Sequence, residues 1–133
     1  MVDQASISQE VLDAFAQVNS KTKRWCIAKV EDSQVVLEAV GERGDDIAAL
    51  AAAIGDEPRY VLYDFEADKP DGSKLQKIVF ICYSPDTCTS MNQKFALQNF
   101  KQSVKSKSNC HREMQVNDKR DIKESEFRDL FDL

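Results

Sequence analysis

The sequence has a single histidine, four scattered glycines, no Cys-x-x-Cys pair and no long apolar run. No stretch approaches the roughly 20 apolar residues that a membrane-spanning helix needs. Scattered glycines cannot build a phosphate-binding loop, and a lone histidine predicts no metal site. The first residues lack the basic and apolar regions of a signal peptide, so we expect a cytoplasmic protein with reduced thiols and no integral membrane association.

Recognisable catalytic arrangements are also missing. No Ser-x-x-Lys, Gly-x-Ser-x-Gly or Cys–His pattern occurs, and three acid pairs fall where surface acids of turns and strand ends are expected: Asp45-Asp46, Asp56-Glu57 and Asp64-x-Glu66. We therefore predict that the protein is not an enzyme and needs no cofactor. A thiol-dependent activity is the alternative, because Cys88 and Cys110 flank a lysine-rich segment that could lower the pKa of a thiol.

The 133 residues, 42% hydrophobic and 31% charged, favour one folded domain over 1–133. Apolar spacing predicts helices at 8–20, 45–55, 90–107 and 121–131 and strands at 24–30, 34–40, 59–66, 76–83 and 113–116. Gly41 and Gly44 are expected to break the chain, and Asp121-x-x-Glu124 resembles a capping box for the last helix. The order αββαββαβα predicts an α/β (α+β) fold, with a mixed sheet of about five strands sandwiched by helices.

Acidic residues are absent from 87–112, a segment that holds five cations: Lys94, Lys101, Lys105, Lys107 and Arg112. It carries +5 in a chain of net charge −5, which leaves −10 for the remainder. The overall negative charge argues against nucleic-acid binding, whereas the basic segment favours an acidic partner. A solvated face without function is the alternative.

The expected helix at 90–107 has two distinct faces at about 100° per residue. The core stripe is Leu97, Phe100 and Val104. A basic stripe, and the residues beside it, comprise Lys94, Lys101, Lys105, Met91, Phe95, Gln98 and Gln102. An exposed aromatic ring beside a lysine row is typical of a binding anchor, and packing of Phe95 under a neighbouring loop is the alternative that the sequence leaves open.

Several motifs occur in a familiar order: I-S-x-x-V-x-x-x-F at 7–15, R-Y-V-L-Y-D-F at 59–65, S-P-D-T at 84–87, the basic helix and M-Q-V-N-D at 114–118. Together they resemble the actin-depolymerising factor/cofilin family over nearly the whole chain. The resemblance implies one actin-depolymerising-factor homology domain. It also implies a monomeric cytoskeletal protein that binds monomeric and filamentous actin and promotes depolymerisation and severing without catalysing a reaction.

The resemblance further implies two actin-binding surfaces. The first, on the N-terminal segment and the long helix, would comprise Asp3, Ser6, Met91, Lys94, Phe95, Gln98, Lys101 and Lys105. The second, against a neighbouring filament subunit, would comprise Lys69, Lys74, Lys77 and Arg128. Asp3 stands where many family members carry a kinase-regulated serine, so such regulation is either absent or uses Ser6 or Ser8.

Two related functions stay open. S-P-x-x-C at 84–88 and M-N-Q-K-F at 91–95 are faintly similar to the glia maturation factor type, which has the same fold and binds the actin-related protein complex at filament branches. Phosphoinositide lipids are a further candidate partner, because a basic surface attracts acidic headgroups. The residues expected to contact them are Lys94, Lys101, Lys105, Lys107 and Arg112.

Overall fold

The structure, a computed structural model, describes residues 7–133. Its elements are α1 (Gln9–Asn19), β1 (Lys23–Glu31), β2 (Gln34–Glu42), α2 (Ile47–Ala53), β3 (Arg59–Asp68), β4 (Lys74–Tyr83), α3 (Met91–Ser108), β5 (Arg112–Val116), η2 (Lys119–Asp121) and α4 (Glu124–Leu130). The predicted order of helices and strands is confirmed, and the short 3-10 helix η2 is added before α4.

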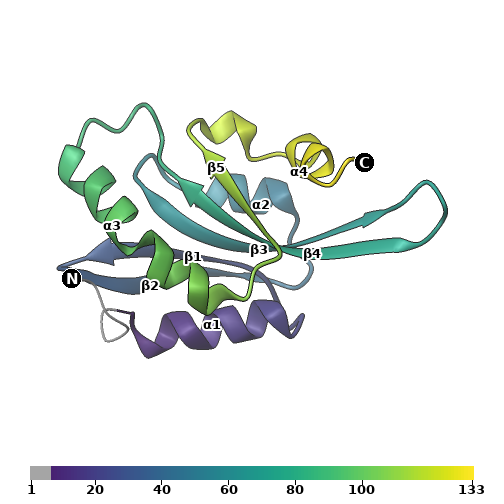
Figure 1. Ribbon diagram of the computed structural model, residues 1–133, viewed down its shortest axis with the longest axis horizontal. Helices are drawn as coiled ribbons and strands as arrows, with labels where there is room; N and C mark the ends of the chain where they lie inside the picture. The colour runs from purple at the N-terminus through teal and green to yellow at the C-terminus, as the bar shows by residue number, and fades with distance from the viewer. Residues whose placement is uncertain (1–6) are drawn as a thin grey trace.

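The five strands form one mixed sheet in the order β2-β1-β3-β4-β5. The first four pair antiparallel, and β5 pairs parallel to β4. Helices α1 and α3 pack on one face of the sheet, and α2 and α4 cover the other (Figure 1). The predicted mixed sheet sandwiched by helices is therefore confirmed.

The central strands β3 and β4 are buried on both faces. All side chains from Tyr60 to Phe65 and from Ile78 to Tyr83 are buried. Because side chains alternate along a strand, one set packs toward α1 and α3, and the other toward α2 and α4. Neither face of these strands can be left to solvent, and this requirement fixes the positions of the covering helices.

Helix α3 is held to the sheet by its apolar stripe and by polar contacts that include a hydrogen bond from β3. Leu97, Phe100 and Val104 are buried, as predicted, and the Tyr60 hydroxyl donates to the Leu97 carbonyl. Ser90 caps the start of the helix by accepting from the Gln93 amide. The two phenylalanines of the helix differ sharply in exposure, since Phe100 is 7% exposed and Phe95 is 60% exposed.

The hairpin of β3 and β4 is longer than predicted. Its register runs without interruption from the Arg59–Tyr83 pair to the Asp68–Lys74 pair, so the expected loop at 67–75 shrinks to residues 69–73. Gly72 adopts a positive φ of 89° in that turn, a conformation that glycine reaches without strain.

Gly41 does not break the chain, contrary to the prediction, but lies inside β2. The indole ring of Trp25 occupies the space beside it, and a Cβ atom at Gly41 would lie 2.2 Å from that ring. The glycine therefore serves close packing across the β1–β2 pair rather than a turn.

Two further local predictions were wrong. Helix α4 begins at Glu124 with Lys123 at its N-cap and no side-chain cap, so Asp121 belongs to η2 and the expected capping box is absent there. Asp64 was expected to be a surface acid, but it is 0% exposed and bonded to Arg43 and Gln76. Arg43 follows β2, so no local pattern around Asp64 indicated this pairing.

Within residues 7–133, no helix is long and apolar enough to cross a bilayer. Across the same residues, no group of three potential metal-ligating side chains comes together.

We predict that Phe100→Ala lowers the free energy of unfolding by roughly 3–5 kcal/mol, because it removes a buried ring and leaves a cavity. Phe95→Ala on the same helix is the matched control and should change stability by less than about 0.5 kcal/mol, because its ring is exposed. Urea unfolding of both variants measures the difference. A larger loss for Phe95→Ala would show that the faces of α3 are assigned the wrong way round.

Candidate functional site

The N-terminal half of α3 presents two large apolar side chains to solvent. Met91 is 57% exposed and Phe95 is 60% exposed, and they are the exposed large hydrophobic side chains of residues 7–133. Their spacing of four positions places them one helical turn apart on the same face, with exposed Gln98 on the following turn. The predicted exposure of Phe95 is therefore confirmed, while its role in binding stays a prediction. Exposed apolar pairs of this kind commonly mark interaction surfaces.

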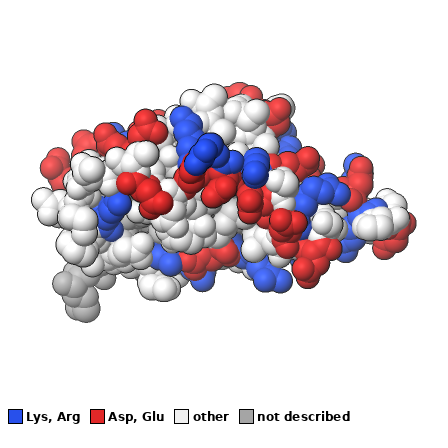
Figure 2. Space-filling view, turned by 90° about the horizontal axis from the view of Figure 1, so that it is seen from above, with Lys and Arg blue, Asp and Glu red and all other residues white. Residues whose placement is uncertain are grey.

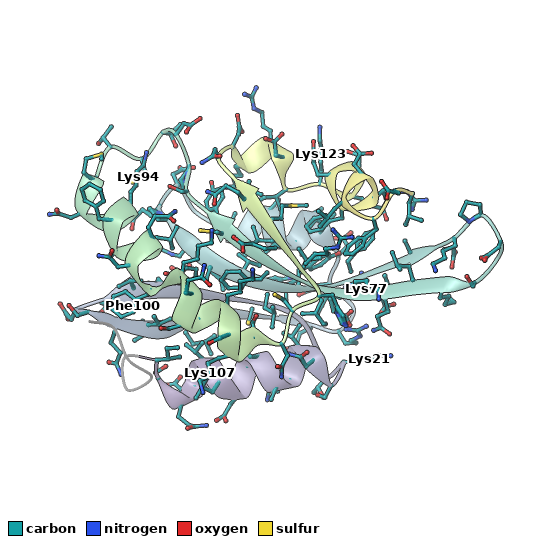
Figure 3. The ribbon with its side chains drawn as sticks, viewed as in Figure 1. Lys21, Lys77, Lys94, Phe100, Lys107 and Lys123 are labelled. Atoms are coloured by element: carbon teal, nitrogen blue, oxygen red, sulfur yellow. The ribbon has the colours of Figure 1, made fainter. Side chains whose placement is uncertain are left out.

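The lysines of α3 fall into two groups. Lys101 and Lys105 both form ion pairs with Glu113 of β5, at 2.5 Å and 2.8 Å. Lys94 and Lys107 lie toward opposite ends of the helix and form no ion pair within residues 7–133 (Figure 3). The basic stripe is therefore interrupted by an internal carboxylate that occupies its middle.

Glu113 is held in its charged form by these contacts. Hydrogen bonds from Lys101 and Lys105, opposed by partial burial, lower the pKa of Glu113 below its usual value. The same hydrogen bond and the charge of Glu113 raise the pKa of Lys105. Lys101 belongs to the predicted basic stripe, but its side chain is only 21% exposed, because it lies back over the sheet toward Glu113.

Arg112 does not join the other predicted phosphoinositide contacts. Side chains alternate along β5, so Glu113 faces α3 whereas Met114 and Val116 pack with the α2–α4 layer. Arg112 also points to the α4 side, where its guanidinium lies over the Phe131 ring at 5.8 Å. The five cations predicted to contact phosphoinositides are thus divided between the two faces of the sheet.

Both predicted N-terminal contacts, Asp3 and Ser6, lie outside the described residues. The described chain begins at Ile7, which forms a bridge with Val35 of the edge strand β2, and Ser8 then precedes α1. The Ser8 hydroxyl is buried.

The second predicted surface surrounds a groove between the β3–β4 hairpin and α4. The groove has a volume of about 550 Å³, and Lys74 and Arg128 both line it. Lys69 is exposed in the loop of the hairpin, and Lys77 is half-buried on β4. The sequence predictions missed four charged residues that share the groove: Arg24, Glu66, Asp68 and Glu124.

Charge is mixed over this second surface. Figure 2 shows acidic and basic side chains interspersed along the half of the molecule that carries the hairpin. Arg24 donates to the Tyr63 hydroxyl at 3.3 Å and lies over its ring, so one groove cation is already engaged. The surface therefore offers paired charges of both signs and not a uniform positive patch.

The cysteines do not form a thiol centre. Cys88 precedes α3 and Cys110 follows it, so the whole of that 18-residue helix separates them. Burial raises the pKa of Cys26 to about 12 and that of Cys82 to about 11, which keeps both thiols protonated at neutral pH. The lone histidine, His111, accepts a hydrogen bond at Nδ1 from the Ile78 amide, a structural contact beside the start of β5.

Comparison with known proteins gives a consistent result. The family model described as cofilin/tropomyosin-type actin-binding protein matches residues 4–131. Actin-depolymerizing factor 3 from Arabidopsis thaliana is 38% identical over 77 residues, and the match covers 55% of each chain. This chain therefore spans about half the length of such plant relatives. A cofilin from Gibberella zeae is 28% identical over 134 residues, with 89% of this chain and 87% of the relative covered.

Solved structures share the fold at low sequence identity. The crystal structure of Plasmodium berghei actin depolymerization factor 2 superposes with a TM-score of 0.82 and 21% identity, over 98% of this chain and 97% of that one. Glia maturation factor from Caenorhabditis elegans has a TM-score of 0.74 and 13% identity, with 93% of each chain covered. Because the family model extends over almost the whole chain, this protein belongs to the cofilin/tropomyosin-type actin-binding protein family.

Proposed function

We propose that this protein binds monomeric and filamentous actin and promotes filament depolymerisation and severing. The observation that carries the proposal is the exposed Met91–Phe95 pair beside Lys94 on α3, in a chain of the cofilin family. An apolar anchor flanked by a cation fits a partner whose surface offers a hydrophobic cleft with acidic residues around it.

The core packing of α3 supports this role. Leu97, Phe100 and Val104 anchor the opposite face of the helix, so Phe95 stands on a rigid element and little conformational entropy is lost on binding. The helix therefore acts as a preorganised contact surface, with Gln98 extending it by one turn.

The hairpin and α4 supply the second, filament-specific contact. Lys69 and Lys74 are exposed at the end of the hairpin, and Arg128 lies across the groove from Lys74. Paired charges around a groove favour a partner surface that is itself mixed in charge. This surface is expected to add affinity for filaments over monomers.

Membership of this family also confirms the prediction that the protein is not an enzyme, because the family comprises actin-binding proteins without catalytic activity. Phosphoinositide binding stays a prediction with a smaller set of free contacts. Lys94 and Lys107 are available, whereas Lys101 and Lys105 would have to leave Glu113 to meet a headgroup.

The proposal is tested by co-sedimentation with purified actin filaments and by fluorescence titration of labelled actin monomers. Binding to bare filaments, without any actin-related protein complex, supports it. Failure to bind filaments or monomers, together with binding to that complex, would assign the glia maturation factor type of function instead.

Phe95→Ala should raise the dissociation constant for actin monomers by about thirtyfold, equivalent to roughly 2 kcal/mol for loss of a buried aromatic anchor. Phe100→Ala is expected to show the reverse signature, a large stability loss with near-normal affinity for the fraction that stays folded. Fluorescence titration measures both affinities. Unchanged binding by Phe95→Ala would remove this ring from the interface.

Lys94→Glu should slow association with actin and make it less sensitive to salt, because a cation facing an acidic partner is reversed. Lys21→Glu makes the same change in net charge on the turn after α1, well away from Lys94 (Figure 3). Stopped-flow association at several salt concentrations compares the two. Equal slowing by both variants would mean that only net charge matters and that Lys94 makes no contact.

Glu113→Gln should speed association with actin at low salt and steepen its salt dependence, because it releases Lys101 and Lys105 toward the partner. Glu42→Gln is the control, since it frees Lys23 on the β1–β2 pair, away from α3. The same stopped-flow measurement applies. A slower association would show instead that Glu113 must hold the two lysines in place for binding.

A further inference from the structure

Part of the β3–β4 hairpin continues beyond the rest of the sheet. β1 pairs with β3 only between Tyr60 and Tyr63, and β5 pairs with β4 only between Val79 and Tyr83. Residues 64–78 therefore have no neighbouring strand on either side, and beyond a buried base they project from the body as a two-stranded ribbon (Figure 1). Such ribbons twist strongly and are marginally stable by themselves. Something outside the ribbon must determine its direction.

Arg43 lies beside β3 where the neighbouring strand ends. One guanidinium nitrogen donates to Asp64 Oδ2 at 2.8 Å and contacts the Lys23 carbonyl at 3.4 Å. The other guanidinium nitrogen pairs with Glu66. Arg43 thus links the turn after β2 and the start of β1 to Asp64 and Glu66, which lie two positions apart on the same face of β3. On this side of β3 it makes the connection that a longer β1 would otherwise make.

The ribbon itself closes this network. Gln76 of β4, the cross-strand neighbour of Glu66, donates its side-chain amide to Asp64 at 2.9 Å and to Glu66 at 3.1 Å. Both carboxylates therefore receive hydrogen bonds from Arg43 and from Gln76. The planar fork of the guanidinium suits this double contact, which a lysine cannot reproduce.

The burial of Asp64 means that its carboxylate needs the contact with Arg43. Its side chain is 0% exposed, and its second oxygen, Oδ1, has no hydrogen-bond partner within residues 7–133. A buried carboxylate without its cation is strongly unfavourable, so the ribbon cannot swing away from Arg43 without exposing or neutralising Asp64.

The opposite face of the ribbon is fixed by apolar contacts. Phe65 stacks with Phe127 and Phe131 of the α4 region, with ring centroids 5.5 Å and 5.8 Å apart, and Leu75 is buried beside them. The base of the ribbon is thus held between an aromatic cluster and the Arg43 network. The aromatic contacts are not directional hydrogen bonds, whereas the forked ion pair requires one orientation of the two carboxylates.

We propose that Arg43 is a positioning residue for filament binding, because it sets the direction of the ribbon whose end carries Lys69 and Lys74. The inference rests on the proposed function of the hairpin as a filament contact. Arg43 itself does not need to touch actin, and monomer binding through α3 does not depend on it.

The test uses the full chain with Arg43→Gln and with the double variant Arg43→Gln/Asp64→Asn, which avoids leaving a buried charge unpaired. Lys23→Gln is the matched control, because it removes a neighbouring cation whose partner is Glu42 and not the ribbon. Filament co-sedimentation, monomer titration and amide hydrogen exchange of residues 66–76 are measured on each protein.

We expect the double variant to bind filaments about tenfold more weakly, a loss of roughly 1.4 kcal/mol, and to keep its monomer affinity within about twofold. Exchange of the ribbon amides should accelerate in it while exchange in α3 stays unchanged. Arg43→Lys, which keeps the charge but not the fork, should recover stability more fully than filament affinity. Lys23→Gln should behave as the unmodified protein does.

Equal loss of monomer and filament binding, or an unchanged filament affinity in the folded double variant, would overturn the positioning role. If the unmodified protein binds neither form of actin, the proposed function fails. Hydrogen exchange then still decides whether Arg43 orders the ribbon, and ribbon exchange that is the same in every variant would show that it does not.

Discussion

Burial of β3 and β4 on both faces is the constraint on which the rest of the structure depends. Strands that are apolar on both sides need a helical layer above and below, and α1, α3, α2 and α4 supply these layers. Helix α3 must turn Leu97, Phe100 and Val104 toward the sheet, so Met91 and Phe95 are left facing solvent. The surface proposed to bind actin is thus a direct consequence of how the core is covered.

The cations that are neighbours in the sequence segment 87–112 have different electrostatic partners in the structure. The segment 87–112 contains no acidic residue, yet Glu113 follows immediately and the alternation of β5 turns it toward α3. Two lysines are paired internally, and Arg112 is carried to the α4 side, where it lies over Phe131. The cationic character of α3 is therefore concentrated at Lys94 and Lys107, and Glu113 competes with any acidic partner for the lysines between them.

The β3–β4 hairpin differs from the covered part of the sheet, because it extends past the helices that cover the two faces. At its base the hairpin has no neighbouring strand on either side. Its position there depends on the stacking of Phe65 with Phe127 and on the ion pair between Arg43 and Asp64. A buried charge of this kind contributes little net stability but penalises every arrangement in which the pair is separated. Such a contact is suited to fixing the direction of a projecting ribbon that would otherwise be held only by apolar packing.

The sequence alone determined the order of elements and the core face of α3, and it placed Phe95 away from that face. These features follow from periodicity within one element, and a helix or strand repeats its geometry whatever lies beside it. The tertiary structure decided that Asp64 is buried, that Lys101 is covered by its contact with Glu113 and that Arg128 shares a groove with Lys74. Each of these pairings joins side chains from different elements, and their distance depends on strand order, register and twist. No local pattern encodes those quantities, because they are settled only when the two faces of the sheet are covered together.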